Sequence, residues 1–273
     1  MPLSTRQLHE REYYDKYVHY SASQQPPIGP LSLAERRDFN PYWYVIRVVK
    51  EEFRSPTQRL LDFGCGPGRY GVMAAQIGFE VFGFDISIQN VLASRALAAE
   101  YNVGARTHFS QGVAEALCYL DNFFDVIAGI DILHHVDIPV AVRECHRVLK
   151  PGGLAAFKEP LEAAVFEPIR KSRLGRWIAP QTASFDRHIT EDERKLTRED
   201  LAAIQRQFPA MRVERFRLLS RLEVFLGDRA LTPEGSSRIE PIDRRLLRVP
   251  LLKRLAGVGV LVMRKEGGCV PRS

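Results

Sequence analysis

The pattern of hydrophobic and polar residues divides most of the chain into short apolar runs and longer stretches with helical spacing. The runs expected to form buried strands are 59–64, 80–87, 123–130 and 154–160, with a further short strand at 105–112. Apolar residues recur at helical spacing in 69–78, 88–104 and 138–153, and Pro151, Gly152 and Gly153 are expected to end the third helix. Apolar strands that alternate with helices are typical of a parallel sheet covered on both faces. The sequence therefore predicts an α/β fold with a doubly wound, mostly parallel sheet.

The alternation becomes less regular after residue 160. Residues 196–208 are expected to form a helix, in which Thr197 is the N-cap and Asp200 completes a capping box. Residues 211–225 and 257–265 have the pattern of two further strands. Three pieces lie outside this scheme: residues 1–55, a stretch near 161–195 and a stretch near 227–256. We interpret them as an N-terminal helical lid and two insertions around a single core of residues 56–273.

Composition places the chain among folded proteins, with 45% hydrophobic and 26% charged residues in a length of 273. No run of 18 apolar residues is present, and the first 20 residues lack the apolar core of a signal peptide. The spacing of the four cysteines fits neither a zinc site nor a disulfide framework. We therefore expect a cytoplasmic protein without a metal site.

The positive charge is concentrated in the C-terminal part. Residues 1–160 hold 16 Lys and Arg against 18 Asp and Glu, whereas residues 161–273 hold 23 against 15. Solvated arginines and an anionic partner both explain this excess. Within it, the stretch "IDRRLLRVPLLKRLAG" (242–257) mixes leucines with basic residues, which suggests either contact with a membrane or lipid, or a helix that packs its leucines on the core. Pro250 would interrupt a single long helix there.

The stretch "RLLDFGCGPGRYG" (59–71) places a glycine-rich turn between a strand and a helix. Such a turn lets a ligand approach the backbone and the helix N-terminus, but dinucleotides and other adenosine ligands both use it. Asp62, directly before the turn, would repel a pyrophosphate and suits a ligand with an ammonium group. Asp85 follows Gly64 by 21 residues, where a ribose-binding acid is expected. A ribose, a cationic amino-acid end and no phosphate together describe S-adenosylmethionine.

Four motifs in order carry a resemblance to a known family: "LLDFGCGPGRYG", "VFGFDIS", "FFDVIAGIDILHHV" and "HRVLKPGGLAAFKEP". Residues 57–160, which contain them, resemble the class I S-adenosylmethionine-dependent methyltransferases. The resemblance is greatest to the branch with the quinone-biosynthesis C-methyltransferases and many small-molecule O-methyltransferases. It implies a seven-stranded Rossmann-like sheet that ends in a reversed hairpin, and S-adenosylmethionine as the cofactor.

The resemblance also implies cofactor contacts. Asp62 and the glycine turn would hold the methionine end, Asp85 the ribose, and Ile86 with Ser87 the adenine. The segment "QGVAEAL" would lie along the adenine edge, with Val113 where the family usually has an aspartate. Tyrosines of the lid would touch the cofactor, or would only pack the lid on the core. The predicted cofactor residues are Asp62, Gly64, Cys65, Gly66, Gly68, Asp85, Ile86, Ser87, Ala114, Glu115, Ile130, Tyr14 and Tyr17.

The acceptor is expected beyond the strand ends, near Ile130. His134 and His135 are candidates for a general base, since histidine titrates near neutral pH. Either histidine could instead only pack beneath the cofactor, and adjacent residues seldom share one metal ion. Glu159 is a third catalytic candidate, with a structural carboxylate as its alternative. His188 is a weaker one.

We therefore expect an enzyme that transfers a methyl group from S-adenosylmethionine to an oxygen or carbon of a small, hydrophobic or glycosylated metabolite. The alternatives are methylation of RNA or protein through the basic C-terminal part, and a cofactor-binding protein without transfer. Methyltransferases that act on nucleic-acid amines carry an acidic or Asn-Pro-Pro-aromatic signature where this chain reads "GIDILHH", so a nucleic-acid partner is not expected. The sequence gives no prediction of oligomeric state.

Overall fold

The computed structural model describes residues 3–24, 27–37, 39–162, 194–219 and 239–267, without the side chains of 17–24. Its sheet has seven strands in the order β3-β2-β1-β4-β5-β7-β6. β7 is antiparallel to both of its neighbours, and the other pairs are parallel. The predicted doubly wound, mostly parallel sheet with a reversed final hairpin is confirmed. The strands are β1 (Arg59–Phe63), β2 (Glu80–Asp85), β3 (Thr107–Gln111), β4 (Phe124–Ile130), β5 (Leu149–Pro160), β6 (Arg212–Phe216) and β7 (Val258–Arg264).

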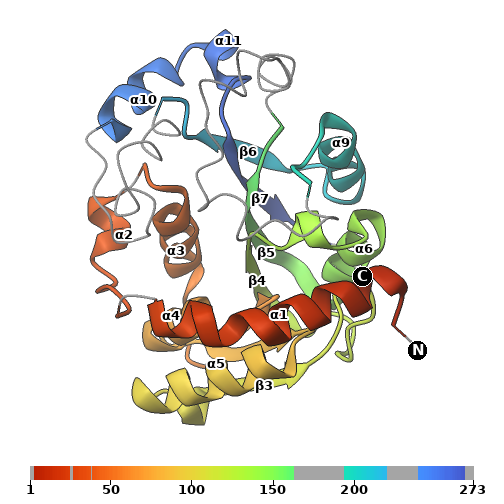
Figure 1. Cartoon of the computed structure of the whole chain (residues 1–273). Coiled ribbons are helices and arrows are strands. Elements are labelled where there is room, and N and C mark those ends of the chain that lie inside the picture. Colours follow the sequence, from red (N-terminus) through yellow and green to blue (C-terminus); the bar gives the residue numbers. More distant parts are fainter. Residues whose placement is uncertain (1–2, 25–26, 38, 163–193, 220–238, 268–273) are drawn as a thin grey trace, which may run out of the picture.

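Helices cover both faces of this sheet. Figure 1 shows the sheet between α3 on one side and α6 and α9 on the other, with α1 crossing in front of the strands. The α-helices are α1 (Thr5–Gln24), α2 (Leu33–Arg36), α3 (Pro41–Glu52), α4 (Arg69–Ile77), α5 (Ile88–Glu100), α6 (Ile138–Val148), α9 (Arg198–Gln207), α10 (Glu240–Leu246) and α11 (Pro250–Lys253). Two 3-10 turns follow α5 and β4, at Gly104–Arg106 and Leu133–His135.

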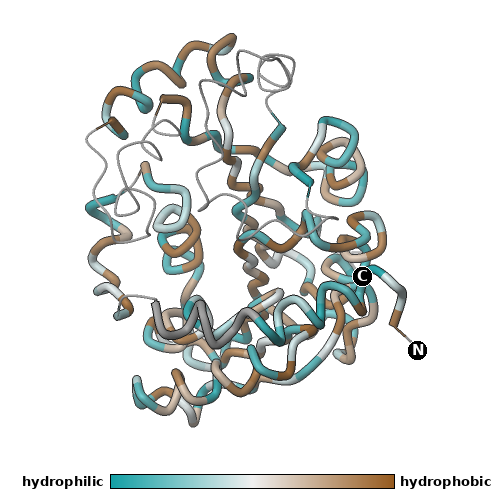
Figure 2. Tube along the Cα trace, in the orientation of Figure 1, coloured by the Kyte–Doolittle hydropathy of each residue, from teal (hydrophilic) through white to brown (hydrophobic). Residues whose placement is uncertain are grey.

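The alternation of side chains along the central strand produces two hydrophobic layers. Leu60 of β1 packs with α3 and α4, including the fully buried Trp43, whereas Leu61 faces α6 and α9, including Ile204. Figure 2 shows hydrophobic residues concentrated along the central strands. Burying apolar side chains on both faces fixes the strand register, because a shift by one residue would exchange the two faces. The carboxyl ends of β1, β2 and β4 are thereby held at one edge.

The predicted end of the third helix is wrong. α6 stops at Val148, and Leu149 already pairs with Phe124 as the first residue of β5. The ladder then shifts register, so that Leu154 pairs with Val126, and Gly152 takes a positive φ of 79° in the intervening bulge. The Pro-Gly-Gly run therefore forms an irregularity inside a strand and not the end of a helix.

Predictions after residue 160 have mixed outcomes. The capping box at Thr197 and Asp200 is present, as predicted. The strand expected at 211–225 is too long, because β6 ends at Phe216 and Arg217 turns into the left-handed region at φ 58°. Residues 220–238 lie outside the described part. Residues 163–193, which include His188, also lie outside the described part. On either side of that gap, Leu161 and Leu196 pair as an isolated bridge.

The first 55 residues divide between two positions. α1 packs on α5 and lies over the carboxyl edge of the sheet, where a lid was expected. α3, which Asn40 caps through its side chain, packs on the sheet instead and buries Trp43, Ile46 and Val49 completely. Within the residues that the structure describes, no helix has the length and apolar character needed to span a membrane.

Candidate cofactor and acceptor site

A cavity of about 230 Å³ lies beneath α1, at the carboxyl ends of β1, β2 and β4. In open α/β sheets, ligands bind at this edge, in the crevice where neighbouring crossovers diverge. The residues that line the cavity are Gln7, Glu10, Tyr14, Gly64, Gly66, Pro67, Phe84, Asp85, Ile86, Asn90, Gly112, Val113, Ala114, Glu115, Ile130, Asp131, Ile132, His135 and Val136.

The glycine-rich turn between β1 and α4 forms one wall. Gly64, Gly66 and Gly68 all have positive φ, at 69°, 50° and 83°, which a residue with a side chain rarely adopts. A Cβ on Gly64 would lie 2.5 Å from Cγ1 of Ile132, whereas a Cβ on Gly66 would meet nothing within 4 Å. The turn thus packs tightly behind Gly64 and leaves room beside Gly66, where a ligand could approach the backbone.

Asp85 ends β2 and forms a second wall. Its Oδ2 accepts the backbone N–H of Gly66 at 2.9 Å, while Oδ1 accepts Ser87 N at 2.9 Å and Asn90 Nδ2 at 3.1 Å. Burial raises the pKa of this carboxyl, and the hydrogen bonds from Ser87, Asn90 and Gly66 oppose that rise. Asp85 therefore connects the glycine turn to the start of α5 and exposes a carboxylate to the cavity.

Asp62 lies behind the turn and does not line the cavity. It is 2% exposed, and its Oδ2 has no hydrogen-bond partner in the described part. Burial raises the pKa of Asp62 to about 7, against the opposing effect of the Gly71 backbone N–H, and the nearby charge of Asp85 raises it further. An unpartnered carboxylate oxygen behind the glycine turn gives this wall a group that favours a positive charge.

The charges of the cavity walls are of one sign. Four carboxylates line the cavity, and none of its lining residues is a lysine or arginine. Glu115 and Asp131 are paired with Arg6 and Lys158, which lie outside the lining, while Asp85 takes its hydrogen bonds from neutral donors. Such a cavity suits a cation and opposes the pyrophosphate of a dinucleotide.

α1 is held over the cavity by polar contacts with three loops. Arg6 donates to Glu115 Oε1 at 2.5 Å and to the backbone oxygen of His135 at 2.6 Å. Gln7 donates to Glu115 Oε2 at 2.9 Å, and Asp15 accepts the hydroxyl of Ser87 at 2.5 Å. These contacts join α1 to the ends of β2 and β4 and to the loop before β4, so the helix closes the cavity like a lid.

His135 is the histidine that reaches the cavity. Its Nε2 lies 3.2 Å from the Tyr14 hydroxyl, and its Nδ1 lies 3.3 Å from Glu10 Oε2. Both partners come from α1, and the Tyr14 ring meets the imidazole edge-on with centroids 5.8 Å apart. The lid therefore orients the imidazole through both of its nitrogens.

His134 packs against the His135 ring, with centroids 4.1 Å apart, but does not line the cavity. Its Nδ1 lies 2.7 Å from Glu159 Oε2, and the other carboxylate oxygen of Glu159 accepts the backbone N–H groups of Ile132 and Leu133. Both side chains are almost completely buried. The His134–Glu159 pair fixes the turn after β4, and this turn places His135 at the cavity.

The structure brings most of the predicted site residues to the cavity, but not all of them. Those that line it are Gly64, Gly66, Asp85, Ile86, Ala114, Glu115, Ile130, Tyr14 and His135. Those placed behind its walls are Asp62, Cys65, Gly68, Ser87, His134 and Glu159. The Cys65 thiol is buried, and burial raises its pKa well above the usual range. The side chain of Tyr17 lies outside the described part.

Sequence reasoning missed several lining residues, chiefly Gln7, Glu10, Asn90 and Asp131. A signal for two of them was present, because Gln7, Glu10 and Tyr14 are spaced so that they share one face of a helix. Asp131 takes a left-handed conformation at φ 54° directly after β4, which no pattern of the sequence indicates. No group of three or more potential ligands for a metal ion occurs among the described residues.

Comparison with known proteins identifies a methyltransferase domain in the chain. The sequence model described as a methyltransferase domain matches residues 61–157, from β1 to β5. Residues 61–157 therefore form a methyltransferase domain. The glycine turn and Asp85 lie in the matched region.

Similar proteins extend the match beyond the core. This methyltransferase is 28% identical over 207 residues to a ubiquinone biosynthesis O-methyltransferase of Sinorhizobium medicae (strain WSM419), covering 71% of this chain and 82% of that one. A protein with the same description from Chelativorans sp. (strain BNC1) is 32% identical over 139 residues, covering 50% and 54%. A solved geranyl diphosphate methyltransferase, in complex with GPP and sinefungin, has a TM-score of 0.58 at 14% identity, covering 96% of this chain and all of that one. That likeness shows the shared fold.

Proposed function

We propose that this methyltransferase transfers the methyl group of S-adenosylmethionine to an oxygen or carbon atom of a small organic molecule, of which a hydrophobic or glycosylated metabolite is one class. The observation that carries the proposal is the cavity beneath α1, whose charged lining side chains are all acidic apart from the titratable His135. The named relatives are described as ubiquinone biosynthesis O-methyltransferases. A small-molecule acceptor therefore agrees with both the site and the relatives.

The residues present fit the cofactor. The open space at Gly66 would admit its methionine end, and Asp85 would accept hydrogen bonds from the ribose hydroxyls. The unpartnered carboxylate oxygen of Asp62 would favour the positive charges from behind the turn. The apolar side chains of Phe84, Ile86 and Val113 would enclose the adenine between them. When bound, S-adenosylmethionine supplies an electrophilic methyl carbon next to a sulfonium.

α1 has two roles in the proposed reaction. It excludes water from the cavity, which strengthens the electrostatic interactions inside and protects the methyl donor. It also completes the walls, because Gln7, Glu10 and Tyr14 come from it. The cavity of about 230 Å³ is smaller than usual small-molecule sites, which start at roughly 300 Å³. α1 must therefore shift to admit the cofactor and the acceptor together.

His135 would take the proton of an acceptor hydroxyl. As the acceptor oxygen bonds to the methyl carbon, the carbon–sulfur bond breaks and the hydroxyl proton must leave. The Glu10 carboxylate, 3.3 Å from Nδ1, favours the tautomer with the proton on Nδ1 and leaves Nε2 as the acceptor. The Tyr14 hydroxyl, 3.2 Å from Nε2, would have to yield this position to the acceptor hydroxyl when α1 shifts. His134 and Glu159 would act as positioning residues, since both lie behind the cavity wall.

Transfer of labelled methyl groups tests the proposal. The protein is incubated with S-adenosylmethionine carrying a radioactive methyl group and with separate panels of phenols, catechols and quinols, of RNA, and of protein. We expect label in the extracted small molecules of at least one panel, and none when Asp85→Ala replaces the wild type. Label found in RNA or protein alone, with every small molecule unlabelled, would overturn the proposed acceptor class.

A further inference from the structure

The segment of residues 239–256, which contains α10 and α11, exposes large apolar side chains that the core does not use. Leu251 is 69% exposed, Ile242 49% and Val249 47%. Leu247 is buried, and Leu246, Leu252 and Leu255 pack beside it against Leu218 and Ala256. The expectation that this segment packs its leucines on the core therefore accounts for four of them and leaves Leu251 in solvent.

The charged side chains of the same segment divide by sign. Arg244, Arg245, Arg248, Lys253 and Arg254 are all exposed. The two acidic residues are engaged on the inner side, where Asp243 accepts the backbone N–H groups of Leu218 and Leu219, and Glu240 pairs with Arg37 at 2.9 Å. Among the described residues, the surface of the segment therefore combines apolar with positively charged side chains, and the segment's own two carboxylates are engaged elsewhere.

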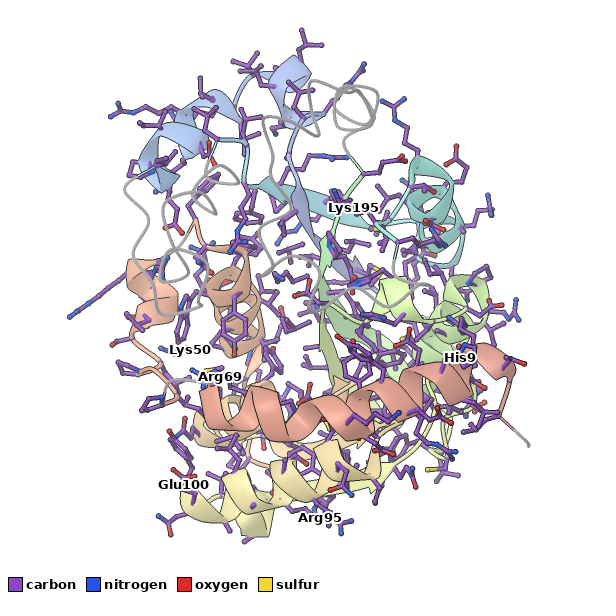
Figure 3. All side chains as sticks on the ribbon, viewed as in Figure 1. His9, Lys50, Arg69, Arg95, Glu100 and Lys195 are labelled. Atoms are coloured by element: carbon purple, nitrogen blue, oxygen red, sulfur yellow. The ribbon has the colours of Figure 1, made fainter. Side chains whose placement is uncertain are left out.

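The break between the two helices gives the segment its shape. α10 ends at Leu246, and Pro250 starts α11 with Val249 as its cap, as the position of the proline predicted. Figure 2 shows hydrophobic and hydrophilic residues alternating along both helices, and Figure 3 shows their side chains projecting from the molecule. Val249 and Leu251 flank Pro250, between the basic residues Arg248 and Lys253.

The segment lies at the same edge of the sheet as the cofactor cavity. β7 begins directly after it, and Val258 pairs both with Pro160 at the carboxyl end of β5 and with Phe216 at that of β6. The cavity opens at the carboxyl ends of β1, β2 and β4 in the same sheet. A surface bound by the segment would therefore lie on the side where the acceptor enters.

We propose that residues 239–256 bind the surface of a membrane with anionic lipids, with Ile242, Val249 and Leu251 inserted between the headgroups and the five basic side chains on the lipid phosphates. Exposed apolar side chains flanked by arginine and lysine are the chemistry by which a peripheral protein lies in the interface. Charge complementarity favours this occupant, because the lipid phosphates offer counter-charges to Arg245, Arg248, Lys253 and Arg254 and a neutral apolar partner does not. The proposal concerns binding alone and does not depend on the methyl acceptor.

Cosedimentation with vesicles tests it, using vesicles of phosphatidylcholine alone and vesicles in which about a third of that lipid is phosphatidylglycerol. We expect binding to the anionic vesicles and its loss at high salt. The Arg248→Glu/Lys253→Glu variant should bind about thirtyfold more weakly, and Val249→Gln/Leu251→Gln about tenfold more weakly. Matched controls on other faces, Arg143→Glu/Arg206→Glu and Leu120→Gln, should bind as the wild type does, since these residues are also exposed.

Three results would overturn the proposal. One is no binding of wild-type protein to anionic vesicles, and another is binding that both segment variants retain. The third is a wild-type dimer in light scattering that Val249→Gln/Leu251→Gln converts to a monomer without a change in vesicle binding, which would assign the surface to a second copy of the chain. Thermal unfolding of each variant confirms that it is folded before it is compared.

Discussion

Asp62 keeps a carboxyl group inside the protein behind the cofactor turn, where burial raises its pKa to about 7 from the ordinary value of 3.8. The folded state therefore holds this proton more tightly than the unfolded state does. Between those two pKa values the folded protein binds more protons, so stability falls as the pH rises. The stabilising contribution is fully present below pH 4 and is lost as the pH passes through 7.

Replacing Asp62 by asparagine should remove this pH dependence. A difference of about three pKa units corresponds to roughly 4 kcal/mol in the free energy of unfolding. We expect Asp62→Asn to gain stability relative to wild type by that order between pH 4 and pH 8, as measured by urea unfolding. Asp121→Asn, which changes an exposed carboxylate, serves as the control. Parallel pH profiles for wild type and Asp62→Asn would contradict the raised pKa.

His135 provides the residue-scale test of catalysis. His135→Gln should lower kcat by about a hundredfold or more, because a positioned general base contributes that much. Its effect on the Kd of S-adenosylmethionine should stay within a few-fold. The control is His108→Gln, whose imidazole lies half-exposed on β3. An unchanged kcat with a raised KM would instead give His135 a binding role.

At the scale of elements, the glycine turn depends on close packing between α4 and α5. A Cβ on Gly68 would lie 2.4 Å from the Cβ of Ser94, and the φ of 83° adds strain for any side chain. Gly152 offers a matched control, because its φ of 79° is similar and a Cβ there would meet nothing within 4 Å. Comparing substitutions at Gly68 and Gly152 therefore separates the cost of backbone strain from the cost of steric overlap.

Gly68→Ala should therefore destabilise the protein more than Gly152→Ala does. Backbone strain alone costs about 1–2 kcal/mol, and the overlap with Ser94 should raise the total for Gly68→Ala by a further 1–3 kcal/mol. Urea unfolding of both variants measures the difference. Equal losses of unfolding free energy in the two variants would mean that α5 can move away from the turn at no cost.

The lid helix is the second element whose role can be tested. Arg6→Ala removes the contacts of α1 with Glu115 and with the backbone of His135. A partly buried hydrogen-bonded ion pair is worth about 1–2 kcal/mol, so we expect S-adenosylmethionine to bind roughly five- to thirtyfold more weakly. Hydrogen exchange of α1 should become faster as well. Arg11→Ala, on the same helix, is the control, since no ion pair of Arg11 is seen among the described residues.

For the whole molecule, local patterns were sufficient to predict the sheet. Each strand is a short apolar run between turns, and the alternation with helices determines their parallel order. The end of α6 was mispredicted because a Pro-Gly-Gly run serves equally as a helix stop and as a bulge, and pairing with Phe124 decides between them. The length of β6 was overestimated because its end depends on how Arg217 turns, at φ 58°.

The candidate site was predictable where a local motif contains it. Gly66 and Asp85 belong to sequence motifs and line the cavity, as do Glu115 and Ile130. Glu10 was missed because its position depends on how α1 docks against a loop more than 100 residues away in the chain. The two histidines could not be distinguished because they are adjacent in sequence and their rings pack together, with centroids 4.1 Å apart. Only their contacts, of His134 with Glu159 and of His135 with Tyr14, set the two roles apart.

The central claim is that the cavity beneath α1 binds S-adenosylmethionine through Asp85. The most direct test is calorimetry of S-adenosylmethionine and S-adenosylhomocysteine with wild type, Asp85→Ala and Asp125→Ala. Asp125 is the control because it lies at the opposite end of β4, where it binds Arg59 N and Lys150. We predict micromolar binding by wild type and Asp125→Ala, and a loss of about 2 kcal/mol or more in Asp85→Ala. Equal binding by all three proteins, or none by folded wild type, would contradict the account.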